Sequence, residues 1–402
     1  MKWGKVKVGD CCEVTSSKRI FFSEYVDSGV PFYRSKEIIE SSNGQAISEP
    51  LFISQEKYDE IKNHFGVPQS GDMLLTSVGT IGVPYIVREK DYFYFKDGNL
   101  TWFRNFSDEL DSKYLYFWVK SSEGQSVLNN TTIGSSQKAL TIASLKGLEI
   151  PCPPAPVQKR IVEFLAGYDD LIENNQKQIK LLEEAAQRLY KEWFVDLRFP
   201  GHETTPIVDG VPEGWERMVL SEVTSVLKRG ISPKYSDNGK YSVINQKCIR
   251  SSIMDISESR RQEKEYEPTL NLQDSDTVIC STGTGTLGRV GRVYGDYPNT
   301  TFDSHVTLVR AKENPNYIYH VVKSQQEYLM GMGRGSTNQQ ELYRDVIERL
   351  VVLCPSQDIL LKADRVLNAI HCKIKAVYLQ NNLLVESRDR LLPKLMSGEI
   401  EV

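Results

Sequence analysis

The chain has 402 residues, which is more than one ordinary hydrophobic core accommodates, so we expect at least two domains. Hydrophobic residues make up 40% of it and charged residues 25%, as in soluble globular proteins, and no apolar run is long enough for a transmembrane helix. The net charge of −4 argues against a protein that coats nucleic acid by bulk charge, but it leaves open a local surface that reads DNA.

The cysteines and the N-terminal segment indicate a cytoplasmic protein. Seven cysteines, with Cys11 next to Cys12, do not have the pattern of a disulfide framework. The opening MKWGKVKVGD lacks the apolar region of a signal peptide. Because there is no CxxC and the five histidines are scattered, a zinc site has no support. We therefore expect a reduced, cytoplasmic protein without a bound metal.

The sequence repeats itself once. From Leu140 onward the offset between the copies stays at 202 residues, so that Leu140 matches Leu342 and Cys152 matches Cys354. A period of this length is far too long for a solenoid and indicates the duplication of a whole unit.

Each copy has two unlike parts. The first part alternates short β-type runs, such as TVIC at 277–280, with turns and short helical stretches such as KYLYFWVK at 113–120, which predicts a mixed α/β domain. The second part is a long helix preceded by prolines. The predicted order is domain 1 at 1–152, a helix at 153–197, a turn-rich linker at 198–213, domain 2 at 214–354, and a helix with a tail at 355–402.

The apolar residues of both helices recur in alternating steps of three and four, which is typical of a coiled-coil seam. The seam carries a helix-pairing set, expected also to serve partner binding, of Ile161, Leu165, Ile172, Ile179, Leu182, Leu189 and Trp193 in the first helix and Leu367, Ile370, Ile374, Val377, Leu384, Leu391 and Leu395 in the second. Polar residues within the seam, such as Asn175, Asn381 and Arg388, penalise wrong registers. The alternative is an amphipathic helix packed on its own domain.

Two homologous domains on two homologous helices form an internal pseudo-two-fold repeat if the helices pair antiparallel. A helix of about 36 residues is about 54 Å long, so it would hold the domains a fixed distance apart. Symmetric DNA readers place their reading elements one or more helical turns apart in this way. Because the two copies differ in sequence, the two half-sites that they read would differ too.

Candidate base-reading residues lie in two pairs of polar segments. The first Gly/Gln loop (131–138) and the second Gly/Gln loop (333–340) combine glycines with amides and cations, and two early segments at 33–36 and 245–247 occupy similar places. The candidates are Arg34, Lys36, Ser135, Ser136, Gln137, Lys138, Asn245, Gln246, Lys247, Arg334, Thr337, Asn338, Gln339 and Gln340. The alternative is that these are ordinary solvated loops.

Signals for catalysis are weak. GTGTLG at 283–288 fits the GxGxxG pattern, but it runs into a predicted strand instead of the helix that would hold a phosphate, so we expect a turn. The chain has no Walker motif and no Asn/Asp-Pro-Pro-aromatic motif of an adenine methyltransferase. Cys152 and Cys354 have no nearby histidine, and we interpret them as small apolar residues. We expect no catalytic residues.

Five segments carry a resemblance to a known family. They are IPCPP at 150–154, QKRIV at 158–162, WFVD at 193–196, PEGW at 212–215 and LLPKLMSGEI at 391–400. On these residues the chain resembles, over its whole length, the DNA-specificity subunit of type I restriction–modification systems. One departure is Leu360, which stands in the second helix where the first has Gln158.

The resemblance implies an α/β fold with two target-recognition domains joined by two long antiparallel coiled-coil helices. It implies a non-catalytic subunit that binds double-stranded DNA with a split target and two modification subunits, with or without an ATP-driven restriction subunit. No cofactor belongs to this chain; S-adenosylmethionine would be held by the modification subunits and ATP with Mg²⁺ by the restriction subunit. Three alternatives are a specificity subunit of a related methylation-only or anti-phage system, a coiled-coil protein-binding scaffold, and an enzyme that uses the GxGxxG segment.

Overall fold

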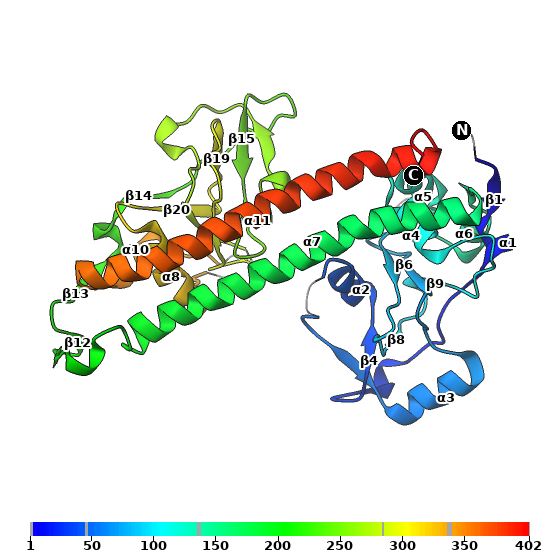
Figure 1. Ribbon diagram of the computed structural model, residues 1–402, viewed down its shortest axis with the longest axis horizontal. Coiled ribbons are helices and arrows are strands. Elements are labelled where there is room, and N and C mark those ends of the chain that lie inside the picture. Colours follow the sequence, from blue (N-terminus) through cyan, green and yellow to red (C-terminus); the bar gives the residue numbers. More distant parts are fainter. Residues whose placement is uncertain (1–2, 45–46, 135–137, 284, 336–339, 402) are drawn as a thin grey trace. The chain divides into compact units, whose positions relative to one another are not determined.

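The computed structural model describes residues 3–44, 47–134, 138–283, 285–335 and 340–401 (Figure 1). They form two compact units: unit 1 is Met1–Gln176 with Gln380–Val402, and unit 2 is Lys177–Leu379. Each unit contains one mixed α/β domain and a part of each long helix. The units therefore cut across the linear segments predicted from the sequence.

Domain 1 contains two four-stranded sheets. The first is antiparallel in the order β2-β9-β6-β7, and the second has the order β3-β5-β4-β8, in which β4 and β8 are parallel. The strands are β1 (Lys5–Lys7), β2 (Glu13–Thr15), β3 (Tyr25–Val26), β4 (Val30–Tyr33), β5 (Leu51–Ile53), β6 (Met73–Thr76), β7 (Pro84–Ile86), β8 (Tyr94–Phe95), β9 (Leu100–Arg104) and β10 (Glu149–Pro151). Strand β6 is buried along its whole length, which explains why its sequence does not alternate apolar with polar residues.

The helices of domain 1 are α1 (Val8–Cys11), α2 (Ser35–Ser42), α3 (Gln55–Phe65), α4 (Ser112–Lys120), α5 (Ser122–Thr131) and α6 (Ile142–Lys146). Polar side chains start several of them. The Asp111 carboxylate accepts hydrogen bonds from two amides of the first turn of α4, and the Ser121 hydroxyl accepts one at the start of α5. These caps end the preceding segment and fix where each helix begins.

Domain 2 repeats this architecture. Its four-stranded sheet has the order β14-β20-β17-β18, and a three-stranded sheet has the order β16-β15-β19, in which β15 and β19 are parallel. The linker carries the antiparallel pair β11 (Ile207–Val208) and β12 (Val211–Pro212). The elements of domain 2 are β13 (Glu216–Val219), β14 (Thr224–Arg229), β15 (Tyr241–Ile244), β16 (Arg260–Gln262), β17 (Thr277–Cys280), β18 (Val290–Arg292), β19 (Thr300–Phe302), β20 (Val306–Ala311), β21 (Val351–Cys354), α8 (Pro315–Ser324), α9 (Gln326–Gly331) and α10 (Arg344–Glu348). The shared strand order confirms the duplication predicted from the sequence.

Two long helices complete the chain, α7 (Ala155–Tyr190) and α11 (Gln357–Ser397) (Figure 1). A π-helical turn at Lys191–Val195 follows α7. Pro393 lies inside the last turns of α11. Among the described residues no helix is apolar over a stretch long enough to cross a lipid bilayer.

Within unit 1 the two long helices pair antiparallel. The Arg388 guanidinium on α11 donates to the Asp169 carboxylate on α7 at 2.6 Å, and the Asn175 amide on α7 donates to Gln380 on α11 at 3.4 Å. As the residue number rises along α7, the number of its partner along α11 falls. Two of the polar residues predicted within the seams, Asn175 and Arg388, thus make contacts between the helices.

The predicted helix-pairing set is withdrawn from solvent in both units. Every member is buried or half-buried. In unit 1, Leu165 shares a core cluster with Leu395, and in unit 2, Leu182 packs against the cluster that contains Ile374. Other apolar residues on these helices remain exposed: Phe164, Leu171 and Leu181 on α7, and Leu361, Val366, Leu379 and Leu383 on α11.

Gln158 explains the departure between the two helices. Its side chain is fully buried, donates to the carbonyls of Glu109 (2.7 Å) and Pro153 (2.8 Å), and accepts from the Asp111 amide (2.9 Å). It therefore ties the start of α7 to the loop before α4. Leu360, its counterpart, packs instead against the apolar core of unit 2.

Candidate nucleic-acid interface

The central strand of each domain, β6 in domain 1 and β17 in domain 2, ends beside a buried pair of hydroxyl groups. Ser77, just after β6, is 2.7 Å from Thr101 of β9. In domain 2, Ser281 follows β17 and is 2.6 Å from Thr307 of β20. The pair thus occupies the same place in both copies. It marks the edge of each four-stranded sheet at which β6 and β17 end.

Both Gly/Gln loops return to this edge. The Leu140 amide, just past the first loop, donates to the Ser77 carbonyl at 2.9 Å. The Leu342 amide, just past the second loop, donates to the Ser281 carbonyl at 2.8 Å. The backbone therefore places the last residues of each loop, Lys138 and Gln340, close to the end of the central strand of its own domain.

The early segments reach the same edges. In domain 1 the Ser35 hydroxyl and the Ser77 amide both donate to the carbonyl of Asn99. In domain 2 the side-chain amide of Gln246 donates to the Thr282 hydroxyl at 3.4 Å. The structure thus brings the two predicted segments of each domain together, although about 90 to 100 residues separate them in the sequence.

The cations predicted in domain 1 are engaged within the domain. Arg34 precedes α2 and forms a 2.5 Å ion pair with the buried carboxylate of Glu37. Lys36 lies 3.0 Å from Glu49. Hydrogen bonding to Glu37 raises the pKa of Arg34, which keeps the guanidinium charged. Each would have to exchange or share its carboxylate partner to contact DNA.

In domain 2 the predicted early segment divides into two roles. The Asn245 side chain is buried and accepts a hydrogen bond from the Lys247 amide at 2.8 Å, so it shapes the turn. The Lys247 side chain is exposed, and the structure gives it no ion pair with a described residue. Gln246 is half-buried beside Thr282.

Further polar side chains, which sequence reasoning missed, complete the reading edge of domain 2, a name used here for Asn245, Gln246, Thr282, Asp303 and His305. The Thr282 hydroxyl lies 2.6 Å from Nδ1 of His305, and the His305 amide donates to Asp303 at 2.9 Å. Burial raises the pKa of the Asp303 carboxyl. The repeat offered a signal, because His305 occupies the position of Asn99 in domain 1.

The Gly/Gln loop candidates are only partly described. Lys138 is exposed, Gln340 is half-buried, and Arg334 is exposed with its guanidinium 5.6 Å from the ring centre of Tyr343. The remaining predicted residues lie outside the described residues: Ser135, Ser136, Gln137, Thr337, Asn338 and Gln339. Their DNA contacts stay a prediction.

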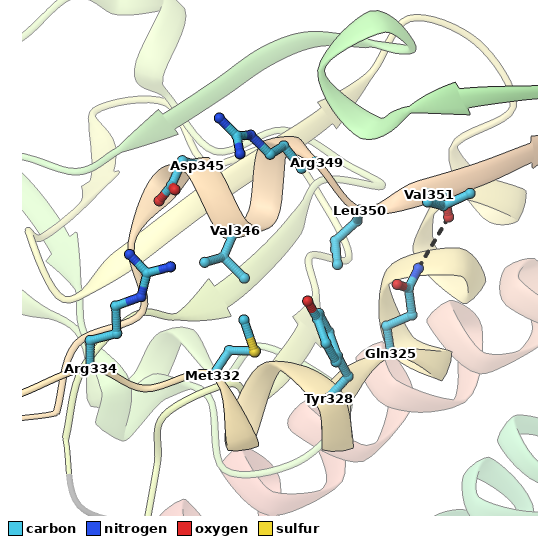
Figure 2. Close-up of a pocket in the computed structure, with 9 residues that line it drawn as sticks. All are labelled: Gln325, Tyr328, Met332, Arg334, Asp345, Val346, Arg349, Leu350 and Val351. Atoms are coloured by element: carbon cyan, nitrogen blue, oxygen red, sulfur yellow. Dashed lines mark hydrogen bonds between the residues drawn. The ribbon is translucent and has the colours of Figure 1, made fainter.

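A pocket of about 310 Å³ flanks Arg334 (Figure 2). Val346, Leu350 and Met332 supply apolar lining, and Figure 2 shows the Tyr328 hydroxyl directed between them and Gln325, which donates to the Val351 carbonyl at 3.4 Å. The lining is completed by Arg334, Asp345 and Arg349. None of the nine lining residues is a serine, cysteine or histidine, and its acid–base groups are the Asp345 carboxyl and the Tyr328 hydroxyl.

In the described part of the GxGxxG segment, residues 285–288 form a turn, as predicted. It joins the antiparallel strands β17 and β18, and a strand follows it where a phosphate-binding motif requires a helix. Gly288 has φ +76°, and a Cβ there would lie 2.6 Å from the Met330 amide nitrogen. The described residues contain no cluster of His, Cys, Asp or Glu that could hold a metal ion. Burial raises the pKa of Cys152 to about 11 and also that of Cys354, which disfavours the thiolate.

Comparison with known proteins agrees with this architecture. The profile of the type I restriction modification DNA specificity domain matches residues 1–184 and 212–359. The chain is 27% identical over 424 residues to the MjaIX type I restriction enzyme specificity subunit of Methanocaldococcus jannaschii, covering 100% of this chain and 94% of the relative. It is 22% identical over 335 residues to the HindI specificity subunit of Haemophilus influenzae, covering 65% and 71%. In fold it is similar to the type I S subunit of M. genitalium, with a TM-score of 0.57, 16% identity and coverage of 98% and 96%.

Proposed function

Because the chain belongs to the family of type I restriction–modification DNA-specificity subunits, we propose that it reads a split target and directs adenine methylation by partner subunits. Its role is DNA recognition without catalysis. The observation that carries the proposal is the duplicated domain, in which each copy gathers a Gly/Gln loop and an early polar segment at the end of its central strand. Domain 1 would read one half of the target and domain 2 the other.

The difference between the two edges supports two unlike half-sites. Domain 1 carries Arg34 and Lys36, whose charges are paired with carboxylates, whereas domain 2 presents Lys247 without such a pair. Amide and guanidinium groups can each make paired hydrogen bonds to a base edge in the major groove. The candidate residues of both Gly/Gln loops belong to this proposal.

The partners are two modification subunits, which would hold S-adenosylmethionine, with or without a restriction subunit that uses ATP and Mg²⁺. Exposed apolar side chains support binding of partners along the long helices. In unit 1, Phe164 is 41% and Leu171 51% exposed, and in unit 2, Leu181 is 65% and Leu361 62% exposed. The helix-pairing set is buried or half-buried and would serve mainly packing within the chain. The genes beside this one distinguish a restricting system from a methylation-only one.

Single-molecule methylation mapping tests the proposal. The chain is expressed with its neighbouring modification gene, and the methylated motif is compared with that of cells lacking the chain. We expect a split adenine motif that depends on the chain. Exchange of residues 1–150 for those of another family member should then change one half of the motif only. A verified soluble complex that leaves the methylation pattern unchanged would overturn the proposal in favour of a scaffold.

A further inference from the structure

Several cations of domain 2 are held by carboxylates. Lys228 lies 2.9 Å from Glu267, and Lys234 lies 3.0 Å from Glu263. Arg260 on β16 differs from them, because its side chain is exposed and the structure gives it no ion pair with a described residue. Its guanidinium therefore has no carboxylate within ion-pairing distance among the described residues of domain 2.

An aromatic ring orients Arg260. The guanidinium carbon lies 3.7 Å from the ring centre of Tyr235, the distance of a stacked cation–π contact. Tyr235 pairs through its backbone with Gln262 of the same strand. Stacking restricts the rotamers of the arginine before any ligand arrives, so its planar group of donors is partly pre-organised.

Tyr235 also connects Arg260 to the reading edge. Its hydroxyl lies beside the side chains of Asn245 and Asp303, both members of that edge. Asp303 in turn accepts the hydrogen bond from the His305 amide. The stacked pair is therefore continuous with the polar groups that follow the central strand of domain 2.

Domain 1 has the tyrosine but not the arginine. Strands β4 and β5 of domain 1 correspond to β15 and β16 of domain 2. Leu51 of β5 lies opposite Phe32 of β4, and Arg260 of β16 lies opposite Val243 of β15, so Leu51 takes the place of Arg260. By the same registers Tyr25, which pairs with the end of β5, is the counterpart of Tyr235. At equivalent strand positions the two domains thus share a tyrosine, and domain 2 has an arginine where domain 1 has a leucine.

From this arrangement we infer that Arg260 is a specificity-determining residue, which donates a pair of hydrogen bonds to a guanine in the half-site read by domain 2. The inference rests on the proposed function. An arginine fork fits the O6 and N7 acceptors of guanine in the major groove, and no other base pair offers two acceptors on one base there. A phosphate contact by the same side chain would add affinity without sequence preference.

Methylation mapping of the assembled complex separates these roles. Arg260→Gln is compared with Arg261→Gln, which removes the same charge from the adjacent exposed residue on the other face of β16. We expect Arg260→Gln to relax selection of one G·C pair by about 5- to 100-fold in the half-site that the 1–150 exchange leaves unchanged. Arg261→Gln should leave the motif as it is. Arg260→Lys, which keeps the charge but loses the fork, should behave like Arg260→Gln.

Three results are informative against the inference or its premise. An even decline of methylation over an unchanged motif assigns Arg260 to a phosphate and overturns the inference, as does a motif and rate identical to wild type. If Arg260→Gln fails to copurify with the modification subunit, Arg260→Lys, with its charge and aliphatic stem retained, decides in the same way. A wild-type complex that yields no split motif fails the proposed function instead.

Discussion

The Nε2 atoms of His320 and His371 lie 3.0 Å apart in the interior of unit 2, where α8 packs against α11. The other ring nitrogen of His371 lies 2.8 Å from the Tyr294 hydroxyl, and that of His320 has no hydrogen-bond partner. Burial, reinforced by the charge of Arg292, lowers the pKa of His320 to about 3 and that of His371 to about 2. Both rings are therefore neutral in the folded protein at neutral pH.

This pair predicts that the chain loses stability in mild acid. Below the usual pKa of about 6.5 the unfolded chain binds a proton at each histidine that the folded chain excludes, at a cost of about 1.4 kcal/mol per pH unit for each. Glu183, whose pKa burial raises to about 7, acts in the opposite sense and offsets one proton between about pH 6.5 and 4.5. The net expectation is a fall in the free energy of unfolding as the pH falls from 6.5, measured by urea denaturation.

Two variants isolate the two contributions. His320→Phe introduces the residue that domain 1 has at the equivalent position, Phe117, and should make the pH dependence shallower. Glu183→Gln should make it steeper, because the opposing proton is lost. A wild-type chain equally stable at pH 7 and pH 5.5 would contradict the assignment of neutral buried rings.

Replacing Gln158 by leucine, the residue that the second helix has, should destabilise unit 1. The substitution leaves two carbonyls and the Asp111 amide without their buried partner. We expect a loss of about 3 kcal/mol in the free energy of unfolding. Leu360→Gln is the reciprocal variant and should also destabilise, because it places an amide against the apolar core of unit 2. If both variants are as stable as wild type, the two residues are interchangeable, and Gln158 does not hold the start of α7 to the loop before α4.

The helix-pairing set should show a sharp contrast with its exposed neighbours. Leu367 is fully buried, whereas Leu361, on the same helix, is 62% exposed. Leu367→Ala is expected to cost about 2–5 kcal/mol of unfolding free energy, since it leaves a cavity. Leu361→Ala should change stability by less than about 0.5 kcal/mol. Copurification with the modification subunit then separates roles, because Leu361→Ala should weaken partner binding if the exposed apolar residues dock it.

The GxGxxG segment supplies a test of turn against nucleotide site. Gly288→Ala combines a positive φ with a Cβ 2.6 Å from the Met330 backbone, so we expect it to cost about 3 kcal/mol. Gly285 has φ +75° but open space around it, and Gly285→Ala should cost about 1 kcal/mol. Calorimetric titration of the wild-type chain with ATP and with NAD should show no binding. Saturable binding of either nucleotide would contradict the turn interpretation.

The duplication and the long helices could be predicted because their signals are contained in the sequence itself. Offsets such as that from Leu140 to Leu342 and the seam spacing need no knowledge of distant contacts. The reading edge could be predicted only in part. Tyr235 and Arg260 meet because a loop pairs with β16, and their contact leaves no periodic pattern to recognise. Asn245 has a side chain that can hydrogen-bond to a base, but in the structure it accepts a hydrogen bond within its own turn.

The division of the chain into units sets an order for its synthesis. Unit 2 is one continuous stretch, Lys177–Leu379, whereas unit 1 needs Gln380–Val402 to complete it. Leu392, Leu395 and Met396 belong to the core cluster of unit 1. That core lacks these three side chains while the ribosome translates unit 2. The N-terminal domain therefore begins first and finishes last. During synthesis the core of unit 1 therefore stays incomplete until the turns of α11 that carry Leu392, Leu395 and Met396 have emerged.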